Sequence, residues 1–224
     1  MPLATYRHLV IDAGDLPSMT KFWARALGLA AEERGDDEVR LRGPTPRHDV
    51  WIEHVPERAT VKQRVHLDVH AHSVDEVLGL GASALDLESF SWQVVRDPEV
   101  GELCVFERAD VPAYRLYEVV VDCREAAPIA TWWAEVLGGR AEHHGGVPWW
   151  WVEDVPGAPF ECFVFVPVPE EKTVKNRIHW DVTVPDIEPL LAAGAAMLHE
   201  PDGESGWTVL ADPDGNEFCA HLEP

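Results

Sequence analysis

An internal duplication constrains the fold of this chain more than any other feature of its sequence. Residues 56–69 recur without a gap as residues 169–182, at an offset of 113, and both segments contain the pattern V-K-[QN]-R-[VI]-H-[LW]-D-V. Two further pairs of segments match in the same order, at offsets of 110 and 115: 22–28 with 132–138, and 92–98 with 207–213. Self-similarity at a nearly fixed period marks a repeated structural unit. We therefore expect two homologous α+β domains, residues 1–113 and 114–224.

Each copy divides further into two half-repeats of the same order. The first half opens with an apolar strand and continues into a helix that has apolar residues at helical spacing and a glycine, Gly28 or Gly138, at its end. Short strands come next, and the second half repeats the order. The expected strands and helices are 8–12, 17–27, 51–55, 65–70, 74–80, 92–96 and 102–107 in the first copy, and 118–122, 127–137, 163–166, 178–184, 186–193, 207–211 and 216–222 in the second. Four βαβββ modules are the prediction.

The charge balance excludes several classes of partner. The chain has 18 Lys and Arg against 40 Asp and Glu, a formal net charge of −22. Nucleic acids and anionic membrane surfaces bind through cationic side chains, so neither is an expected partner. No apolar run reaches the roughly 18 residues of a membrane-spanning helix, and the N-terminus lacks the layout of a signal peptide. These features predict a soluble, cytoplasmic protein.

The cysteines are too sparse to cross-link two domains. No two of them form a C-x-x-C pair. They are Cys104, Cys123, Cys162 and Cys219. We expect four reduced thiols in a reducing compartment.

The motifs together resemble one known superfamily. Paired βαβββ modules, the F-W-x-x-x-L-G helix end, the repeated V-K-[QN]-R-[VI]-H-[LW]-D-V and the D-P-D-G-N-E-F-C turn are similar to the glyoxalase/bleomycin-resistance/dioxygenase (vicinal oxygen chelate) superfamily. The resemblance covers nearly the whole chain and implies tandem glyoxalase-like domains, each of two modules that form a curved sheet around a cavity. It also implies a small organic molecule as substrate or ligand. It leaves the reaction open, since the superfamily includes lyases, isomerases, dioxygenases, thiol transferases and non-catalytic drug-binding proteins.

The resemblance also implies candidate metal ligands in the first copy. In the superfamily, ligands come from the first and last strands of each module. In the first copy these positions hold His8, Glu53 and His66, and the fourth position holds Cys104. Two imidazoles and a carboxylate suit one divalent ion such as Fe, Zn, Ni or Mn and leave positions open for substrate oxygens. We expect such an ion on His8, Glu53 and His66, and no organic cofactor.

The second copy matches this ligand pattern less well. Its equivalent positions hold Glu118, Val166, His179 and Cys219. Because Val166 replaces a carboxylate, we expect any metal to lie in the first copy rather than the second.

The repeated His-x-Asp pattern has two interpretations. Alternate residues of a strand share a face, so Asp68 points the same way as His66, and Asp181 the same way as His179. The carboxylate would then orient a ligand or a base. Alternatively, the pair belongs to the scaffold. Near these pairs, the cations Lys62, Arg64, Lys175 and Arg177 would either grip a substrate carboxylate or, as we favour, neutralise nearby Asp residues.

Tryptophans are concentrated in the second copy, which holds seven of the ten. Trp149 and Trp151 would share one strand face and wall a pocket for a planar ligand, whereas core filling is the other explanation. The polar groups of that pocket would be Glu118, His179 and Asp181. In the first copy, Trp51 would wall the metal site beside Glu53.

These patterns indicate two functions. The first is a small-molecule enzyme with one divalent metal, such as a lyase, isomerase or dioxygenase. The alternative is a metal-free binding or sequestering protein for an aromatic natural product or antibiotic. The sequence leaves the oligomeric state open.

Overall fold

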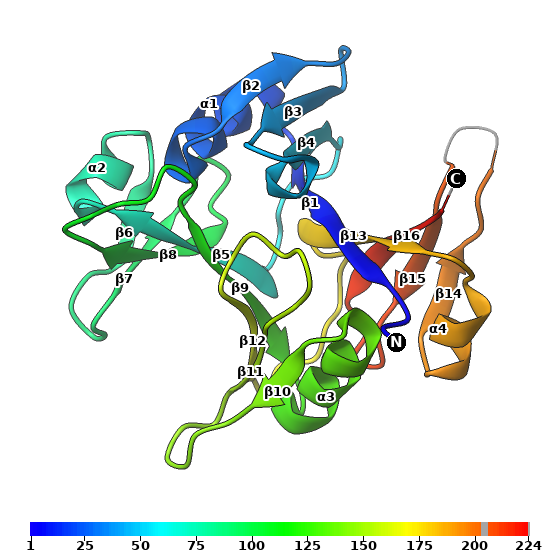
Figure 1. Ribbon diagram of the computed structural model, residues 1–224. Helices are drawn as coiled ribbons and strands as arrows, with labels where there is room; N and C mark the ends of the chain where they lie inside the picture. The colour runs from blue at the N-terminus through cyan, green and yellow to red at the C-terminus, as the bar shows by residue number, and fades with distance from the viewer. Residues whose placement is uncertain (203–205, 224) are drawn as a thin grey trace.

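Four βαβββ modules succeed one another along the chain, as the sequence predicts. The computed structural model describes residues 1–202 and 206–223 (Figure 1). The first module comprises β1 (Thr5–Ala13), α1 (Leu16–Leu27), β2 (Ala30–Glu33), β3 (Glu38–Arg42), the short 3-10 helix η1 (Pro46–His48) and β4 (Val50–His54). The second comprises β5 (Val65–Ala71), α2 (Val74–Leu78), β6 (Ser83–Asp86), β7 (Gln93–Arg96) and β8 (Glu102–Glu107). The third comprises β9 (Leu116–Cys123), α3 (Ala126–Leu137), β10 (Arg140–Glu142), β11 (Trp150–Glu153) and β12 (Cys162–Pro167). The fourth comprises β13 (Ile178–Val184), α4 (Glu188–Ala192), β14 (Ala196–His199), β15 (Thr208–Ala211) and β16 (Glu217–Leu222). The α+β class is confirmed.

The first helix of each repeat begins and ends for local reasons. At the start of α1 the Asp15 side chain accepts a hydrogen bond from the amide of Ser18, at 3.1 Å, which satisfies one free N–H of the first turn. At its end Gly28 has a φ of 71°, and at the end of α3 Gly138 has a φ of 73°. Only glycine adopts this left-handed conformation at little cost, so both helices stop where the sequence predicts.

The strand order shows that the two repeats are interlaced. Sheet A has the order β14-β15-β16-β13-β1-β4-β3-β2, and sheet B has the order β10-β11-β12-β9-β5-β8-β7-β6. Sheet A therefore joins the first module to the fourth through the antiparallel pair β1–β13, and sheet B joins the second to the third through β5–β9. Each curved sheet, which is not closed into a barrel, takes one module from each repeat. In Figure 1 these two strand pairs lie nearest the middle, and the remaining strands extend outward from them.

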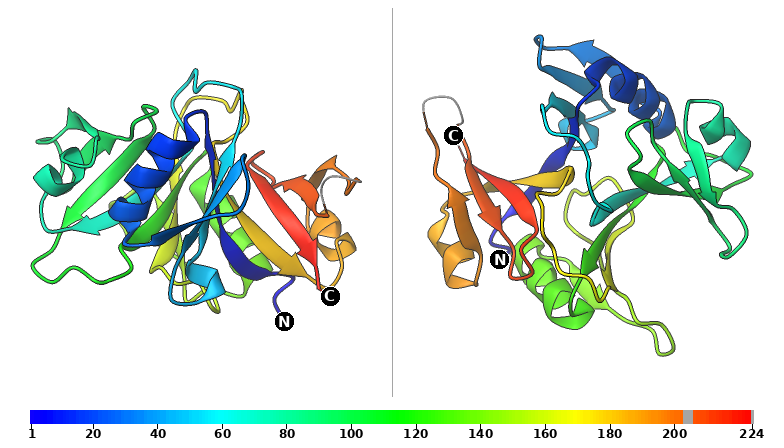
Figure 2. Two further views of the ribbon diagram at one scale, coloured as in Figure 1. Left: turned by 90° about the horizontal axis from the view of Figure 1, so that it is seen from above. Right: turned by 180° about the vertical axis from the view of Figure 1, so that it is seen from behind.

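Aromatic side chains of α3 connect the two sheets in one hydrophobic core. The helix packs on β11 and β12 of sheet B. Its Trp133 also meets Trp180 of sheet A edge-on, with ring centroids 4.8 Å apart, and Phe218 at 5.1 Å. These three rings are fully buried. Burial of such large apolar side chains contributes about 2–3 kcal/mol each, so the contact joins the third and fourth modules, both of the second repeat, across the two sheets. Figure 1 and the right-hand view of Figure 2 both show α3 next to the N-terminal end of β1.

No helix among the described residues is long and apolar enough to cross a membrane.

The interlaced sheets predict that neither repeat folds alone. Fragments 1–113 and 114–224, expressed separately, would each lose the β1–β13 and β5–β9 pairings and expose two unpaired edges. We expect no cooperatively melting monomer from either fragment, and a 1:1 complex when the two are mixed. Analytical ultracentrifugation and circular dichroism would measure both. Intact protein cleaved at an engineered protease site at Asp110 is the control, since its halves should stay together. A folded monomer of either fragment would contradict the prediction.

A matched pair of turns tests how much the side-chain hydrogen bonds of Asp212 contribute to stability. In both repeats an Asp accepts two backbone amides of its own turn: Asp97 from Glu99 and Gly101, and Asp212 from Asp214 and Asn216. Asp212 additionally accepts the indole N–H of buried Trp133, at 3.0 Å.

Asp212→Ala would therefore leave two more buried donors unpaired than Asp97→Ala, namely the indole N–H of Trp133 and the side-chain amide of Asn216, which lies 3.5 Å from Asp212. We expect Asp212→Ala to lower the free energy of unfolding by about 1–2 kcal/mol more than Asp97→Ala does. Urea unfolding of both variants measures the difference. Equal losses would show that these two side-chain hydrogen bonds contribute nothing.

Candidate functional site

One face of sheet A carries a cluster of imidazoles and carboxylates. On β1, Leu9 and Ile11 point into the core, so His8 and Asp12 point to the opposite face. On β13, Trp180 and Val182 occupy the core in the same way, which leaves His179 and Asp181 on the polar face. The antiparallel register then sets His8 directly opposite Asp181.

Asp181 is the centre of this cluster. Its carboxylate lies 2.5 Å from His221 Nε2, 3.3 Å from His8 Nε2 and 3.7 Å from His179 Nε2. The thiol of Cys219 lies 3.6 Å from His179 Nε2. Burial would raise the pKa of Asp181, but hydrogen bonds from His221 and His8 outweigh it and hold that pKa well below its usual range. Asp181 is therefore an ionised carboxylate among three imidazoles, and its Oδ1 has no hydrogen-bond partner among the described residues.

Glu53 supplies a second carboxyl group beside this cluster. It lies on β4, opposite Asp12 of β1. Burial, together with the negative charges of Asp181 and Asp12, raises the pKa of Glu53 to about 7. A carboxyl group with this pKa exchanges a proton near neutral pH or accepts a cation, because either event relieves the repulsion.

Sheet B repeats the core of the cluster with different neighbours. His66 Nε2 lies 3.4 Å from Asp68 and 3.6 Å from the thiol of Cys104. In place of His8, however, sheet B has Glu118, which accepts a hydrogen bond from Cys162 at 3.3 Å. Burial and the charge of Glu118 raise the pKa of Asp68 well above its usual range. The pKa values of these two equivalent carboxyl groups, Asp68 and Asp181, are thus shifted in opposite directions.

The structure does not bring all three predicted metal ligands together. His8 and Glu53 lie on neighbouring strands of sheet A. His66 lies on β5 of sheet B, because the first module pairs with the fourth and not with the second. Its place beside His8 and Glu53 is taken by His179, its counterpart in the second repeat. Trp51 does lie beside His8 as expected, with ring centroids 6.0 Å apart.

The predicted aromatic pocket is likewise divided between the sheets. Glu118 and Trp151 belong to sheet B, whereas His179 and Asp181 belong to sheet A. Trp151 donates to Glu153 at 3.1 Å and its ring meets His144. Trp149 precedes β11 and is half-buried. These tryptophans therefore do not form one pocket with His179 and Asp181.

His221 is the member of the cluster that our sequence prediction omits. It lies two residues after Cys219 on β16, so strand alternation places it on the same face. That signal is present in the sequence, but its meaning depends on knowing that β16 and β1 share a sheet.

A cleft opens on the same face, beside His8. It has a volume of about 550 Å³ and is lined by His8, Trp51, Arg40 and Thr183, among others. Arg40 is neutralised by buried Asp49, at 2.6 Å. The cleft is large enough for a small organic molecule and brings it next to the imidazole of His8.

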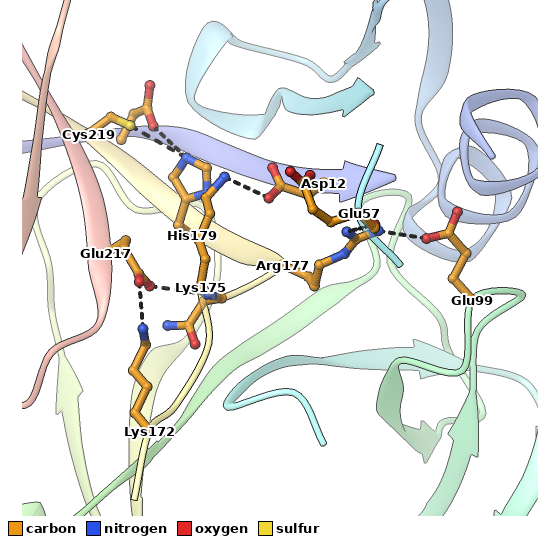
Figure 3. A network of polar contacts seen from close by, with 11 residues as sticks. Asp12, Glu57, Glu99, Lys172, Lys175, Arg177, His179, Glu217 and Cys219 are labelled. Atoms are coloured by element: carbon orange, nitrogen blue, oxygen red, sulfur yellow. Dashed lines mark hydrogen bonds and ion pairs between the residues drawn. The ribbon is translucent and has the colours of Figure 1, made fainter. Parts of the chain in front are cut away.

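Three of the four repeated cations neutralise acidic groups, as we expect from the sequence. Lys62 bonds Asp122 at 2.8 Å, and its counterpart Lys175 bonds Asp12 at 2.7 Å. Arg177 pairs with Glu99 at 2.8 Å. Figure 3 shows the second-repeat cations with these partners, next to His179 and Cys219. Each pair crosses from one repeat to the other.

The four cysteines are free and buried, which confirms that part of the prediction. Burial raises the pKa of Cys123 to about 12 and moves the pKa of each of the other three thiols in the same direction. A thiol reacts as the thiolate, so all four should react slowly in the native protein.

Thiol titration tests this expectation in two states. In denaturant we expect four reactive thiols per chain. In native buffer at pH 7 we expect none to react at the rate of a free thiol. Two thiols in denaturant would contradict the first expectation, and a rapid native reaction would contradict the second.

Comparison with known proteins identifies the class of this fold. A family model described as a glyoxalase-like domain matches residues 8–106 and again residues 118–221. The protein is thus a member of the vicinal oxygen chelate superfamily, and within it the chain belongs to the glyoxalase-like domain family. No curated protein sequence matches it.

Solved structures of the same fold are distant in sequence. Glyoxalase I from Zea mays is 14% identical, with a TM-score of 0.66 over 97% of this chain and 92% of that one. A putative dioxygenase from Bacillus subtilis subsp. subtilis str. 168 is 13% identical, with a TM-score of 0.65 over 100% of this chain and 86% of that one. The cppA protein from Streptococcus pneumoniae TIGR4 is 13% identical, with a TM-score of 0.53 over 98% and 100%. At these identities the likeness establishes the fold alone.

Proposed function

We propose that the protein is an enzyme that acts on a small, oxygen-bearing organic molecule at one divalent-metal site in sheet A. The observation that carries the proposal is the convergence of three imidazole Nε2 atoms on the single carboxylate of Asp181. Beside it lies Glu53, whose pKa is raised to about 7 by burial and by the negative charges of Asp181 and Asp12, which crowd it. A divalent cation would relieve this crowding.

The residues present fit such an ion by their chemistry. His8, His179, Glu53 and Asp181 offer two imidazoles and two carboxylates, a mixed set that suits Fe, Zn, Ni or Mn. The Oδ1 atom of Asp181 is buried without a hydrogen-bond partner, as is Nδ1 of His179, among the residues that the structure describes. Buried polar atoms are rarely left unpaired, so these two unpaired atoms support the proposal that an ion or ligand binds in the cluster. His179, Asp181 and Cys219 also present donor atoms within 4.8 Å of one another.

The remaining residues would position the substrate and move a proton. A bound ion would act as a Lewis acid on substrate oxygens. The cleft beside His8 would hold the substrate, with Trp51 as an apolar wall. His221, the imidazole of the cluster that is not a proposed ligand, hydrogen-bonds Asp181 at 2.5 Å and is the side chain that would accept or return a proton. This combination favours an isomerase or lyase that transfers a proton next to a carbonyl.

A metal-free binding protein is the second candidate. It is favoured by the hydrogen bonds from His8 and His221 to Asp181, which stabilise that carboxylate without an ion. In this case the cleft walled by Trp51 would bind an aromatic compound by contact alone.

The two candidates differ in what Glu53 does. For the enzyme, Glu53→Gln removes an anionic ligand and should weaken binding of Zn²⁺ or Mn²⁺ to chelator-treated protein by about tenfold or more. The matched control is Glu118→Gln in sheet B, which also removes a partly buried carboxyl group of raised pKa. Elemental analysis and calorimetry would measure metal content and affinity.

We expect at most one equivalent of metal per chain, lost in Glu53→Gln and kept in Glu118→Gln. Loss in the Glu118 variant alone would place the ion in sheet B and refute the proposed site. If the intact chain binds no divalent ion, the metal-dependent enzyme is excluded. Quenching of Trp51 fluorescence by an aromatic ligand would then test the binding protein.

A further inference from the structure

We propose that a second site, between the two sheets, binds a monocarboxylate with an apolar body, and that Arg64 is its anion-binding residue. The site is a cleft of about 510 Å³, lined by residues 57–64 and 174–177 together with Asp12 and Val55. We call it the central cleft. It is independent of the metal proposed for sheet A.

The central cleft is unusually basic for this protein. Five of its lining side chains are cationic, against two that are acidic, in a chain of net charge −22. They are Arg58, Lys62, Arg64, Lys175 and Arg177, against Asp12 and Glu57. Lys62, Lys175 and Arg177 are neutralised by Asp122, Asp12 and Glu99. Arg58 and Arg64 form no ion pair with any described carboxylate.

Arg64 is the buried member of that unpaired set. Its residue surface is only 9% exposed. It donates to two backbone carbonyls, Glu170 O at 2.7 Å and Asp122 O at 3.4 Å, and its Nε–H has no acceptor among residues 1–202 and 206–223. A buried guanidinium without an anionic partner is costly, and a carboxylate matches its fork of parallel donors.

Its counterpart Arg177 shows what Arg64 lacks. Arg177 bonds the backbone oxygen of Glu57, as Arg64 bonds that of Glu170, but it also holds the Glu99 carboxylate (Figure 3). Glu99 is the third residue of the turn 97–101. The equivalent residue of the turn 212–216 is Asp214.

Asp214 does not neutralise Arg64 because another arginine binds it. Arg124 donates to Asp214 from its backbone amide, at 2.8 Å, and from Nε, at 2.9 Å. In the first repeat the position of Arg124 is occupied by Gly14, which has no side chain to compete for Glu99. The two repeats thus differ at two positions in a way that removes the counter-ion from Arg64 alone.

Apolar residues of the central cleft indicate the rest of the ligand. Val61 and Val174 occupy equivalent positions of the two lining segments and are 49% and 43% exposed. With Val55 and Ala59 they form the apolar part of the lining of the cleft that Arg64 also lines. A carboxylate attached to a small hydrocarbon or aromatic ring would bind both the Arg64 guanidinium and the apolar lining. Inorganic phosphate would make no favourable apolar contact with the valines.

Calorimetric titration of the intact chain with benzoate tests this site. Benzamide is the control for the neutral ring, and inorganic phosphate is the control for a bare anion. We expect benzoate to bind at one site, and neither control to bind at comparable concentration. Arg64→Met should weaken benzoate at least about tenfold, because it removes charge-assisted hydrogen bonds. Arg177→Met is the matched control, since Arg177 is the counterpart of Arg64 and is already paired with Glu99. It should change the affinity for benzoate by less than about threefold.

A transplanted turn tests the same point with Arg64 intact. Arg124→Gly together with Asp214→Glu copies the first repeat and offers Arg64 a carboxylate of its own. This double variant should lose benzoate binding as Arg64→Met does, even if the latter folds poorly, whereas Arg124→Gly alone should lose less. The proposal is overturned if benzoate binds Arg64→Met or the double variant as tightly as the original chain. It is also overturned if benzamide or phosphate binds as well as benzoate.

Discussion

The antiparallel pairing of β1 with β13 is the contact on which the rest of this structure depends. It joins the first module of the first repeat to the last module of the second, while β5 and β9 join the two inner modules. Once these pairs form, alternation along the strands decides which side chains share a face. The strand pairing also places Lys175 next to Asp12 and Lys62 next to Asp122, so each repeat supplies counter-ions for the other. The buried contact of Trp133 with Trp180 then closes one core between the sheets.

The duplication produces two polar clusters that share a His-Asp-Cys trio and differ in their neighbours. In sheet A, His8 and His221 surround Asp181 and keep it ionised. In sheet B the corresponding positions hold Glu118 and Phe106, so Asp68 has an acidic and an apolar neighbour, and burial together with the charge of Glu118 raises its pKa. The scaffold thus stays constant while the pKa of its central carboxyl group is shifted in opposite directions in the two sheets. This difference explains why the cation is proposed for sheet A, although the same trio occurs twice.

Much of the fold can be predicted from the sequence, because its signals are local. The repeat offset, the apolar periodicity and the two helix-ending glycines predict the four modules and the bounds of α1 and α3 to within a residue. The pairing of the modules cannot be predicted in this way, since β1 would find an acceptable edge in β5 as readily as in β13. The sequence therefore groups His66 with His8 and Glu53, where its counterpart His179 lies. It groups Trp151 with Asp181 for the same reason. In both cases the residue lies in sheet B, whereas the residues grouped with it lie in sheet A.

Small differences between near-identical turns matter because the charges they control are buried. Asp97 and Asp212 hold their turns with the same two backbone hydrogen bonds, so the backbone at residues 99 and 214 is equivalent. The partner that each turn offers depends on side-chain length and on one neighbour: Glu99 reaches Arg177 and faces Gly14, whereas the shorter Asp214 is held by Arg124. On an exposed surface such an exchange would be worth little, because water screens the charges. At Arg64, which is 9% exposed, it decides whether a guanidinium has a counter-ion. A chain this acidic has carboxylates in excess, so the lack of one at Arg64 reflects the geometry of the turn and not a shortage of acidic groups.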